Sequence, residues 1–271
     1  MSYSRPHMLF GLALMAAGAV LFAQQGCQPK EPPTQHAAQG DSHRRSDRQR
    51  AEDRQESPHS MPWKSLFDGE TLTGWKAPEF GGEGKVYVEN GTIVMERGGH
   101  ITGVTWTGKV PCNNYELSLE GMRLEGSDFF CTTTFPVGDD PCSLVVGGWG
   151  GGVVGLSNVD FHDASNNPTR KIMSFAENRW YRVRIRVTDA AIEAWIDDEQ
   201  VINQPRKGHK FGIRSEVDLC RPLGICTYST KGAVRNIKVR SLDAEGKAVG
   251  GKQSSINNRQ SPISPCVPSP S

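Results

Sequence analysis

Residues 86–96 read Val86-Tyr87-Val88-Glu89-Asn90-Gly91-Thr92-Ile93-Val94-Met95-Glu96, two runs rich in β-branched residues on either side of an Asn-Gly pair. Asn and Gly adopt the positive φ angles of a two-residue hairpin turn more readily than other residues. This stretch therefore predicts two antiparallel strands joined by a tight turn.

The same kind of alternation recurs further along the chain. In residues 181–187, Tyr, Val, Ile and Val alternate with three arginines, which is the pattern of a half-buried antiparallel strand. The alternating residues 192–196 lead through Asp197-Asp198 into residues 200–202, so a second hairpin is predicted there. The arginines suit either an anion-binding stripe or, more commonly, the solvent-facing side of a sheet.

A third alternation begins at Tyr115 and changes its apolar parity at Gly121, where Met122 and Leu124 follow. A β-bulge near Gly121 would account for the change. Short apolar runs continue to residue 239, separated by Gly, Pro, Asp or Asn, and 30 of the 271 residues are glycine. Roughly a dozen short strands without a helical period predict an all-β fold, a two-sheet antiparallel sandwich or jelly roll.

The segments that flank this domain, residues 63–243, have a different composition. Residues 1–27 are predicted to be an export signal, because Arg5 and His7 precede an uncharged run over residues 8–23. Cys27 follows Gly26 directly after that run and resembles a bacterial lipidation site, with ordinary secretion or an uncleaved anchor as alternatives. Residues 28–62 and 244–271 are rich in Pro and polar residues and are predicted to be a disordered linker and a disordered tail. We therefore expect an exported protein anchored to the cell envelope through an N-terminal lipid.

The charge of the chain argues against one class of partner. The formal net charge is +1, and the basic and acidic residues of the predicted domain are nearly balanced. A nucleic-acid-binding domain normally carries a basic surface, so no nucleic-acid partner is expected.

Five cysteines lie in the predicted domain, at positions 112, 131, 142, 220 and 226. No Cys-x-x-Cys spacing occurs, so neither a structural zinc site nor an attached haem is expected. Cys131 with Cys142, and Cys220 with Cys226, are spaced for disulfides, which export would permit. The alternative is that they are buried thiols that pack as small apolar residues.

Two stretches carry candidate functional residues. Trp149 stands among five glycines in residues 147–152, where it suits stacking on a sugar ring or burial in the core. Residues 158–167 follow, with Asp160 and His162 as a candidate acid and base, and with Asp163 and Asn166 as candidate substrate-binding residues beside Trp149.

The oxygen atoms of residues 158–167 would also suit Ca²⁺, although Asp and Asn in loops most often form turns. No other cofactor and no metal site is predicted. Asp128 stands at the start of an apolar run and is either a third acid/base candidate or a turn residue.

The opening of the domain, Ser65-Leu66-Phe67-Asp68-Gly69-Glu70-Thr71-Leu72-Thr73-Gly74-Trp75, resembles the start of the 3-keto-disaccharide hydrolase domain family, and residues 224–228 and 234–239 are similar to its final strands. The resemblance covers residues 63–243. It implies a concanavalin A-like jelly-roll sandwich, export, and a saccharide ligand. Members are similar to enzymes that cleave glycosides whose C3 hydroxyl has been oxidised to a ketone.

The chain departs from the family pattern at two places. Ser127-Asp128-Phe129-Phe130 replaces a common Asn-Ser-Gly motif, and the Trp149 glycine run and the Asp160 loop replace a glutamate-bearing strand. Two functions therefore remain: an exported saccharide hydrolase using Asp128, Asp160 and His162, or a non-catalytic carbohydrate-binding module. A structural surface domain without a ligand is a third alternative.

Overall fold

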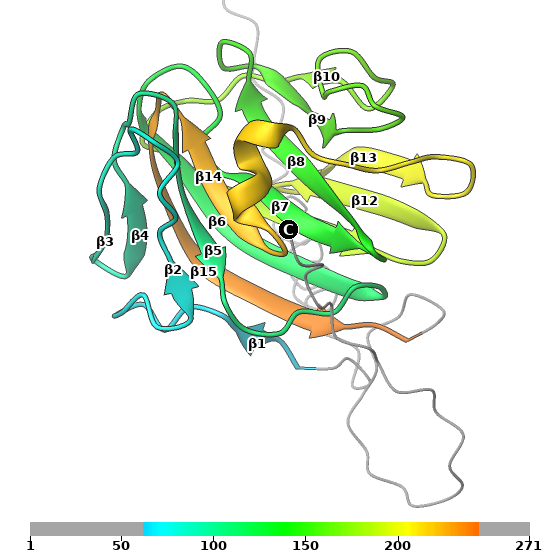
Figure 1. Ribbon diagram of the computed structural model, residues 1–271, viewed down its shortest axis with the longest axis horizontal. Helices are drawn as coiled ribbons and strands as arrows, with labels where there is room; N and C mark the ends of the chain where they lie inside the picture. Colours follow the sequence, from blue (N-terminus) through cyan, green and yellow to red (C-terminus); the bar gives the residue numbers. More distant parts are fainter. Residues whose placement is uncertain (1–61, 244–271) are drawn as a thin grey trace, which may run out of the picture. The chain divides into compact units, whose positions relative to one another are not determined.

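The computed structural model describes residues 62–243, drawn in colour in Figure 1. The predicted export signal with Cys27, the linker up to residue 61 and the C-terminal tail lie outside the described residues. Within residues 62–243, no helix has both the length and the apolar character needed to cross a membrane.

The domain consists of two antiparallel sheets and one short 3₁₀ helix (Figure 1). Sheet A has the order β13 (Glu199–Pro205), β12 (Ala191–Ile196), β11 (Trp180–Val187), β6 (Tyr115–Glu125), β15 (Lys231–Ser241), β4 (Thr92–Met95) and β3 (Val86–Glu89), and β1 (Lys64–Ser65) pairs with β15. Sheet B has the order β10 (Lys171–Ile172), β9 (Val153–Ser157), β8 (Asp140–Gly148), β7 (Thr132–Val137), β14 (Gly224–Tyr228), β5 (Ile101–Trp106) and β2 (Trp75–Lys76). The predicted all-β, two-sheet antiparallel sandwich is confirmed.

Both predicted hairpins are present. β3 and β4 pair up to Glu89 opposite Thr92, and the turn residues Asn90 and Gly91 have φ angles of 49° and 75°. β12 and β13 pair across the second turn, in which Asp197 also has a positive φ. The local turn chemistry thus fixes the register of both strand pairs.

The hydrophobic core lies between the two sheets. Alternate residues of β6 and β11 point inward from sheet A, and alternate residues of β7, β8 and β9 meet them from sheet B. The fully or almost fully buried side chains include Leu117, Ile185, Phe135, Leu144 and Leu156. Each such side chain contributes about 1.5–3 kcal/mol on burial, so this layer supplies most of the driving force for folding.

The predicted change of the inward face at Gly121 is wrong, and no bulge interrupts the pairing of β6 with β11. β6 alternates without interruption through Arg123, and its pairing with β11 keeps one register from Tyr115 to Met122. Gly121 faces inward, toward Cys131: a Cβ on Gly121 would lie 2.5 Å from the Cys131 sulfur atom. The pairing of β6 with β15 has two register shifts, one between Lys231 and Gly232 and one between Arg235 and Lys238. Arg123 therefore occupies a core-facing position.

The arginines of β11 bind a carboxylate of the same chain on the outer face of sheet A. Glu116 is fully buried and forms ion pairs with Arg184, Arg186 and Arg240. Burial alone would raise the pKa of Glu116, but the charges of Arg186 and Arg240 and their hydrogen bonds outweigh it, so its pKa lies below the ordinary value. These ion pairs favour a structural role for the β11 arginines on the outer face of the sheet over a role in binding an external anion.

Neither disulfide considered from the sequence is present, and Cys131, Cys142, Cys220 and Cys226 are buried thiols. The register of β7 and β8 places Cys142 opposite Phe135 rather than opposite Cys131. Burial raises the pKa of Cys142 to about 12. A hydrogen bond with Cys220, together with burial, raises the pKa of Cys226. Cys112 is disulfide-bonded.

Candidate functional site

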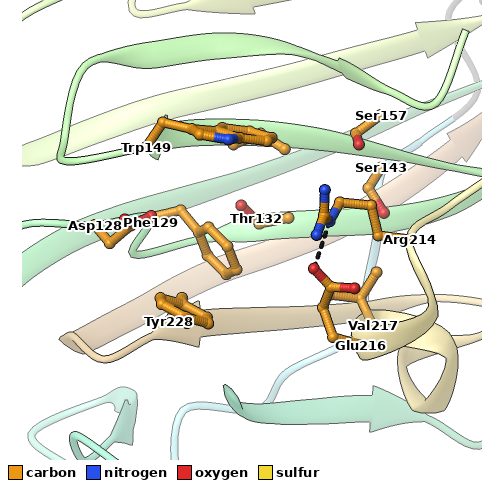
Figure 2. Close-up of a pocket in the computed structure, with 11 residues that line it drawn as sticks. Asp128, Phe129, Thr132, Ser143, Trp149, Ser157, Arg214, Glu216, Val217 and Tyr228 are labelled. Atoms are coloured by element: carbon orange, nitrogen blue, oxygen red, sulfur yellow. Dashed lines mark hydrogen bonds and ion pairs between the residues drawn. The ribbon is translucent and has the colours of Figure 1, made fainter. Parts of the chain in front are cut away.

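A cavity of about 230 Å³ opens on the outer face of sheet B, the face turned away from the core (Figure 2). The 3₁₀ helix η1 (Ser215–Cys220) packs beside it on β5 and β14. Strand alternation directs the lining residues of β8 and β9 to this face, because their neighbours Leu144, Val146 and Leu156 belong to the core. The lining residues are Asp128, Phe129, Thr132, Ser143, Val145, Trp149, Ser157, Arg214, Glu216, Val217 and Tyr228.

One end of the cavity is aromatic. The Trp149 side chain is 43% exposed and lies over the cavity at the turn between β8 and β9 (Figure 2). Phe129 and Tyr228 lie below it, with their ring centroids 5.7 Å apart. An exposed indole offers a flat apolar surface of the kind on which a sugar ring stacks.

Asp128 fixes the turn that carries Trp149. Its Oδ2 accepts a hydrogen bond from the backbone N–H of Gly150 at 3.0 Å, and its Oδ1 accepts one from the N–H of Phe129 at 2.8 Å. Trp149 itself has a φ of 49°. Both carboxylate oxygens of Asp128 thus take part in holding the wall of the cavity.

The opposite end of the cavity is charged. The Arg214 Nε donates to Glu216, and its Nη1 donates to Asp163 at 3.2 Å. The hydrogen bond with Glu216 and the nearby carboxylates raise the pKa of Arg214, which keeps this side chain cationic. Its guanidinium carbon lies 6.0 Å from the centroid of the Trp149 ring. A fixed cation and a carboxylate therefore face the aromatic platform across the cavity.

Three hydroxyl groups lie on the floor between these two ends. Ser143 shares a hydrogen bond with Thr134, and Ser157 donates to Asn158 at 3.0 Å. The Thr132 hydroxyl is buried and has no hydrogen-bond partner within the described domain. The floor thus combines two satisfied polar groups with one that is unsatisfied.

Two of the six sequence-predicted site residues line the cavity, and a third forms an ion pair with a lining residue. Asp128 and Trp149 belong to its lining, and Asp163 lies directly behind it, where it holds Arg214. The sequence did not indicate Arg214 and Glu216 as site residues, because the segment Arg214-Ser215-Glu216 matches no motif. These side chains reach the cavity only because η1 packs on sheet B.

The other three predicted residues lie outside the cavity lining. Asp160 accepts hydrogen bonds from the backbone N–H of Lys210 at 2.9 Å and from His209 at 2.7 Å, and these contacts lower its pKa. A ring nitrogen of His162 contacts the carbonyl oxygen of Asp160, and Asn166 is exposed. A β-bridge between Val159 and His162 closes this turn, which directs Asp160 toward residues 209–210 rather than toward the cavity. The catalytic roles of Asp160 and His162 stay predictions.

The loop that suggested Ca²⁺ arranges its carboxylates separately. Asp160 pairs with His209, whereas Asp163 pairs with Arg214 and accepts hydrogen bonds from Ser165. Between residues 62 and 243, no group of three or more His, Cys, Asp or Glu side chains could hold a metal ion. Calcium binding at this loop stays a prediction.

A β-sandwich with an open pocket that joins an exposed tryptophan to an ion pair and hydroxyl groups has the features of a carbohydrate-active domain. The chain belongs to the family of 3-keto-alpha-glucoside-1,2-lyase-like domains, whose sequence profile matches residues 62–240. This membership confirms the resemblance seen in the opening motif, and the two antiparallel sheets agree with the sandwich that the resemblance implied.

Several solved structures are similar to this domain at low sequence identity. A provisionally assigned glycosyl hydrolase from Parabacteroides distasonis is 15% identical, with a TM-score of 0.44 over 67% of this chain and 94% of its own. The carbohydrate-binding module CBM66 from Bacillus subtilis is 10% identical, with a TM-score of 0.41 over 66% of this chain and 100% of its own. The Crh5 transglycosylase in complex with NAG is 13% identical, with a TM-score of 0.44 over 64% of this chain and 69% of its own. No curated protein sequence matches the chain.

Proposed function

We propose that the cavity on the outer face of sheet B binds 3-keto-glycosides and that the domain cleaves their glycosidic bond. The observation that carries the proposal is the placement of the Trp149 platform opposite the Arg214–Glu216 ion pair in one open cavity. Family membership supports the same substrate class.

The chemistry needs few groups. A ketone at C3 acidifies the proton on C2, so a base can remove that proton while the negative charge moves to the ketone oxygen. The electron pair then forms a C1=C2 double bond as the C1–O bond breaks, and the departing oxygen takes up a proton. Water adds across the double bond in a second step and completes the hydrolysis.

The residues of the cavity match these requirements. Arg214 presents a cation that can stabilise negative charge on the ketone oxygen. Of the two carboxylates in the lining, Asp128 has both oxygens engaged by backbone N–H groups, whereas the Oε2 of Glu216 accepts no hydrogen bond from the described residues. We assign the base to Glu216 and a supporting or proton-donating role to Asp128.

The test is turnover of a 3-keto-disaccharide compared with its unoxidised parent, by the wild type and by Glu216→Gln. The wild type should release sugar from the oxidised substrate alone, and Glu216→Gln should lower kcat by about 100-fold. Glu193→Gln, the same change on the outer face of sheet A, should leave kcat unchanged. Absence of both turnover and binding in the wild type would reject the proposal.

A non-catalytic carbohydrate-binding module is the second candidate. It is favoured by the engagement of the two lining carboxylates, since Asp128 holds a turn and Glu216 is paired with Arg214. Binding of the 3-keto-disaccharide without release of sugar would support the binding module and would reject the hydrolase.

The cellular setting belongs to the proposal as well. Residues 1–27 are proposed to direct export, with Cys27 as the lipid attachment site, which would place the domain at the cell envelope. Metabolic labelling with a radioactive fatty acid should mark the wild type and not Cys27→Ser. Equal labelling of the two proteins would contradict the lipoprotein assignment.

A further inference from the structure

A buried arginine lies beneath the cavity wall. Arg123 is 6% exposed and faces inward from β6, where the alternating pattern calls for an apolar residue. Its guanidinium forms no ion pair with any carboxylate in residues 62–243, and its Nε has no hydrogen-bond partner there. Burial lowers the pKa of Arg123, an effect that the charge of Asp128 opposes. A buried cation without a counter-ion is costly, and such departures from the pattern concentrate at functional sites.

The guanidinium is bound by backbone carbonyl oxygens. Its Nη2 donates to the carbonyls of Asp128 at 3.1 Å, Gly151 at 3.2 Å and Gly147 at 3.5 Å, and its Nη1 donates to that of Phe175 at 3.4 Å. Three of these four carbonyls belong to the two segments that form the aromatic end of the cavity. A single side chain thus ties the Asp128 segment to the turn that carries Trp149.

One glycine near Trp149 makes room for the guanidinium. A Cβ on Gly147 would lie 2.7 Å from the Arg123 Nη2, whereas a Cβ on Gly151 would crowd the Ser127 carbonyl oxygen at 2.9 Å and would lie at an ordinary contact distance of 3.5 Å from the guanidinium. The two glycines have φ angles of 77° and 111°, which side chains rarely adopt. Gly147 therefore leaves the space that the guanidinium occupies.

We propose that Arg123 is the positioning residue of the saccharide pocket: it clamps the carbonyls on both sides of Trp149 and thereby sets the orientation of the indole ring. The effect on saccharide binding rests on the proposed function. The clamping of Trp149 does not, and it can be measured without a ligand.

The experiment uses the six tryptophans as reporters. Protein labelled with 5-fluorotryptophan gives one ¹⁹F signal for each indole, and Trp149→Phe identifies the signal of Trp149. We compare the wild type with Arg123→Lys and Arg123→Met. The matched control is Arg240→Met, which removes an arginine that is also mostly buried but that lies on the outer face of sheet A. Thermal unfolding verifies that each variant is folded.

The Arg123→Met signal of Trp149 should shift or broaden while the other five stay in place, and Arg123→Lys should partly restore it. Arg240→Met should leave the Trp149 signal unchanged. The Kd for methyl 3-keto-α-D-glucopyranoside should be about tenfold higher in Arg123→Met than in the wild type. In Arg240→Met it should stay within about twofold of the wild-type value. An unchanged Trp149 signal in both Arg123 variants, or an equal disturbance of all six signals, would overturn the inference. If the wild type does not bind the keto sugar, the proposed function fails, and the Trp149 signal alone decides the positioning role.

Discussion

Replacing Glu116 by Gln should destabilise the domain more than almost any other single conservative change on sheet A. The Glu116 carboxylate accepts hydrogen bonds from Arg184 at 3.0 Å, from Arg186 at 2.9 Å and from Arg240 at 2.7 Å. Gln offers one acceptor in place of two charged oxygens and leaves three guanidiniums facing one another. The consequence is like-charge repulsion in a partly buried site.

The magnitude follows from the burial of the partners. Breaking a fully buried ion pair costs about 3–5 kcal/mol. The three arginine side chains are 15–35% exposed, so water offsets part of the loss. We therefore expect the lower end, about 3 kcal/mol, which corresponds to a fall in Tm of about 6–12 °C for a domain of this size.

The effect should depend on pH in a definite direction. The pKa of Glu116 in the folded protein lies below its ordinary value of 4.5. Its contribution to stability is therefore complete above that ordinary value and disappears as the pH falls through the lower, folded pKa. The Gln variant has no such group, so the stability difference should be full at pH 7 and should narrow below about pH 4.

Urea unfolding of both proteins at pH 7 and pH 3 measures this difference. Glu193→Gln is the control, because Glu193 is not fully buried and forms only a 3.6 Å ion pair with Arg186 and an exposed hydrogen bond from Gln200. It should lower the free energy of unfolding by less than about 1 kcal/mol. A loss below about 0.5 kcal/mol in Glu116→Gln, or a difference equal at the two pH values, would refute the reasoning.

Two further changes test the wall and the floor of the cavity. Gly147→Ala should lower the free energy of unfolding in urea by about 2 kcal/mol or more, because a Cβ there meets the buried guanidinium and φ is 77°. Gly81→Ala, with a φ of 84° and open space around its Cβ, should lower it by about half as much. Equal losses in the two variants would exclude the steric contact. Thr134→Val should lower the free energy of unfolding by about 1 kcal/mol, because it breaks the hydrogen bond to Ser143. Thr132→Val, on the same face of β7, should leave stability almost unchanged, because the Thr132 hydroxyl has no hydrogen-bond partner within the described domain. A thermal melt in which Thr132→Val is the less stable variant would contradict the assigned contacts.

The sheet architecture was predictable because local signals agreed with it. The Asn90-Gly91 turn identifies a strand pair, and the alternation of residues 181–187 identifies a strand, from neighbouring residues alone. The order of strands within each sheet was not predictable in this way, since it depends on contacts between distant segments. β6 pairs with both β11 and β15, for example, and β15 lies more than a hundred residues further along the chain.

The incorrect prediction of a change of face at Gly121 shows that a sequence pattern does not reveal contacts with other segments. Met122 and Leu124 suggested that the inward face of β6 had changed, but these side chains are half-buried on the outer side and Arg123 points inward. A charged residue enters the core there because backbone carbonyls surround it, one from the adjoining loop at Asp128 and others from more distant residues, Gly151 and Phe175. No property of residues 115–125 alone indicates those carbonyls.

The candidate site was predictable only in part. Trp149 stood out by its glycine neighbours, and Asp128 by its position before an apolar strand, and both line the cavity. Arg214 and Glu216 reach the same cavity through η1, a short segment without a sequence pattern. Asp160 looked equally suitable from its neighbours, yet its loop turns toward His209.

The most direct test of the central claim, that the outer face of sheet B is the saccharide site, is calorimetric titration of the wild type, Trp149→Ala and Trp180→Ala with methyl 3-keto-α-D-glucopyranoside. Trp180 lies on sheet A under Arg235, away from the cavity lining, and serves as the control. Loss of the stacking platform should weaken binding about tenfold in Trp149→Ala, which is about 1.4 kcal/mol, and Trp180→Ala should stay within about twofold of the wild type. Equal affinity in all three proteins, or a loss confined to Trp180→Ala, would contradict the account.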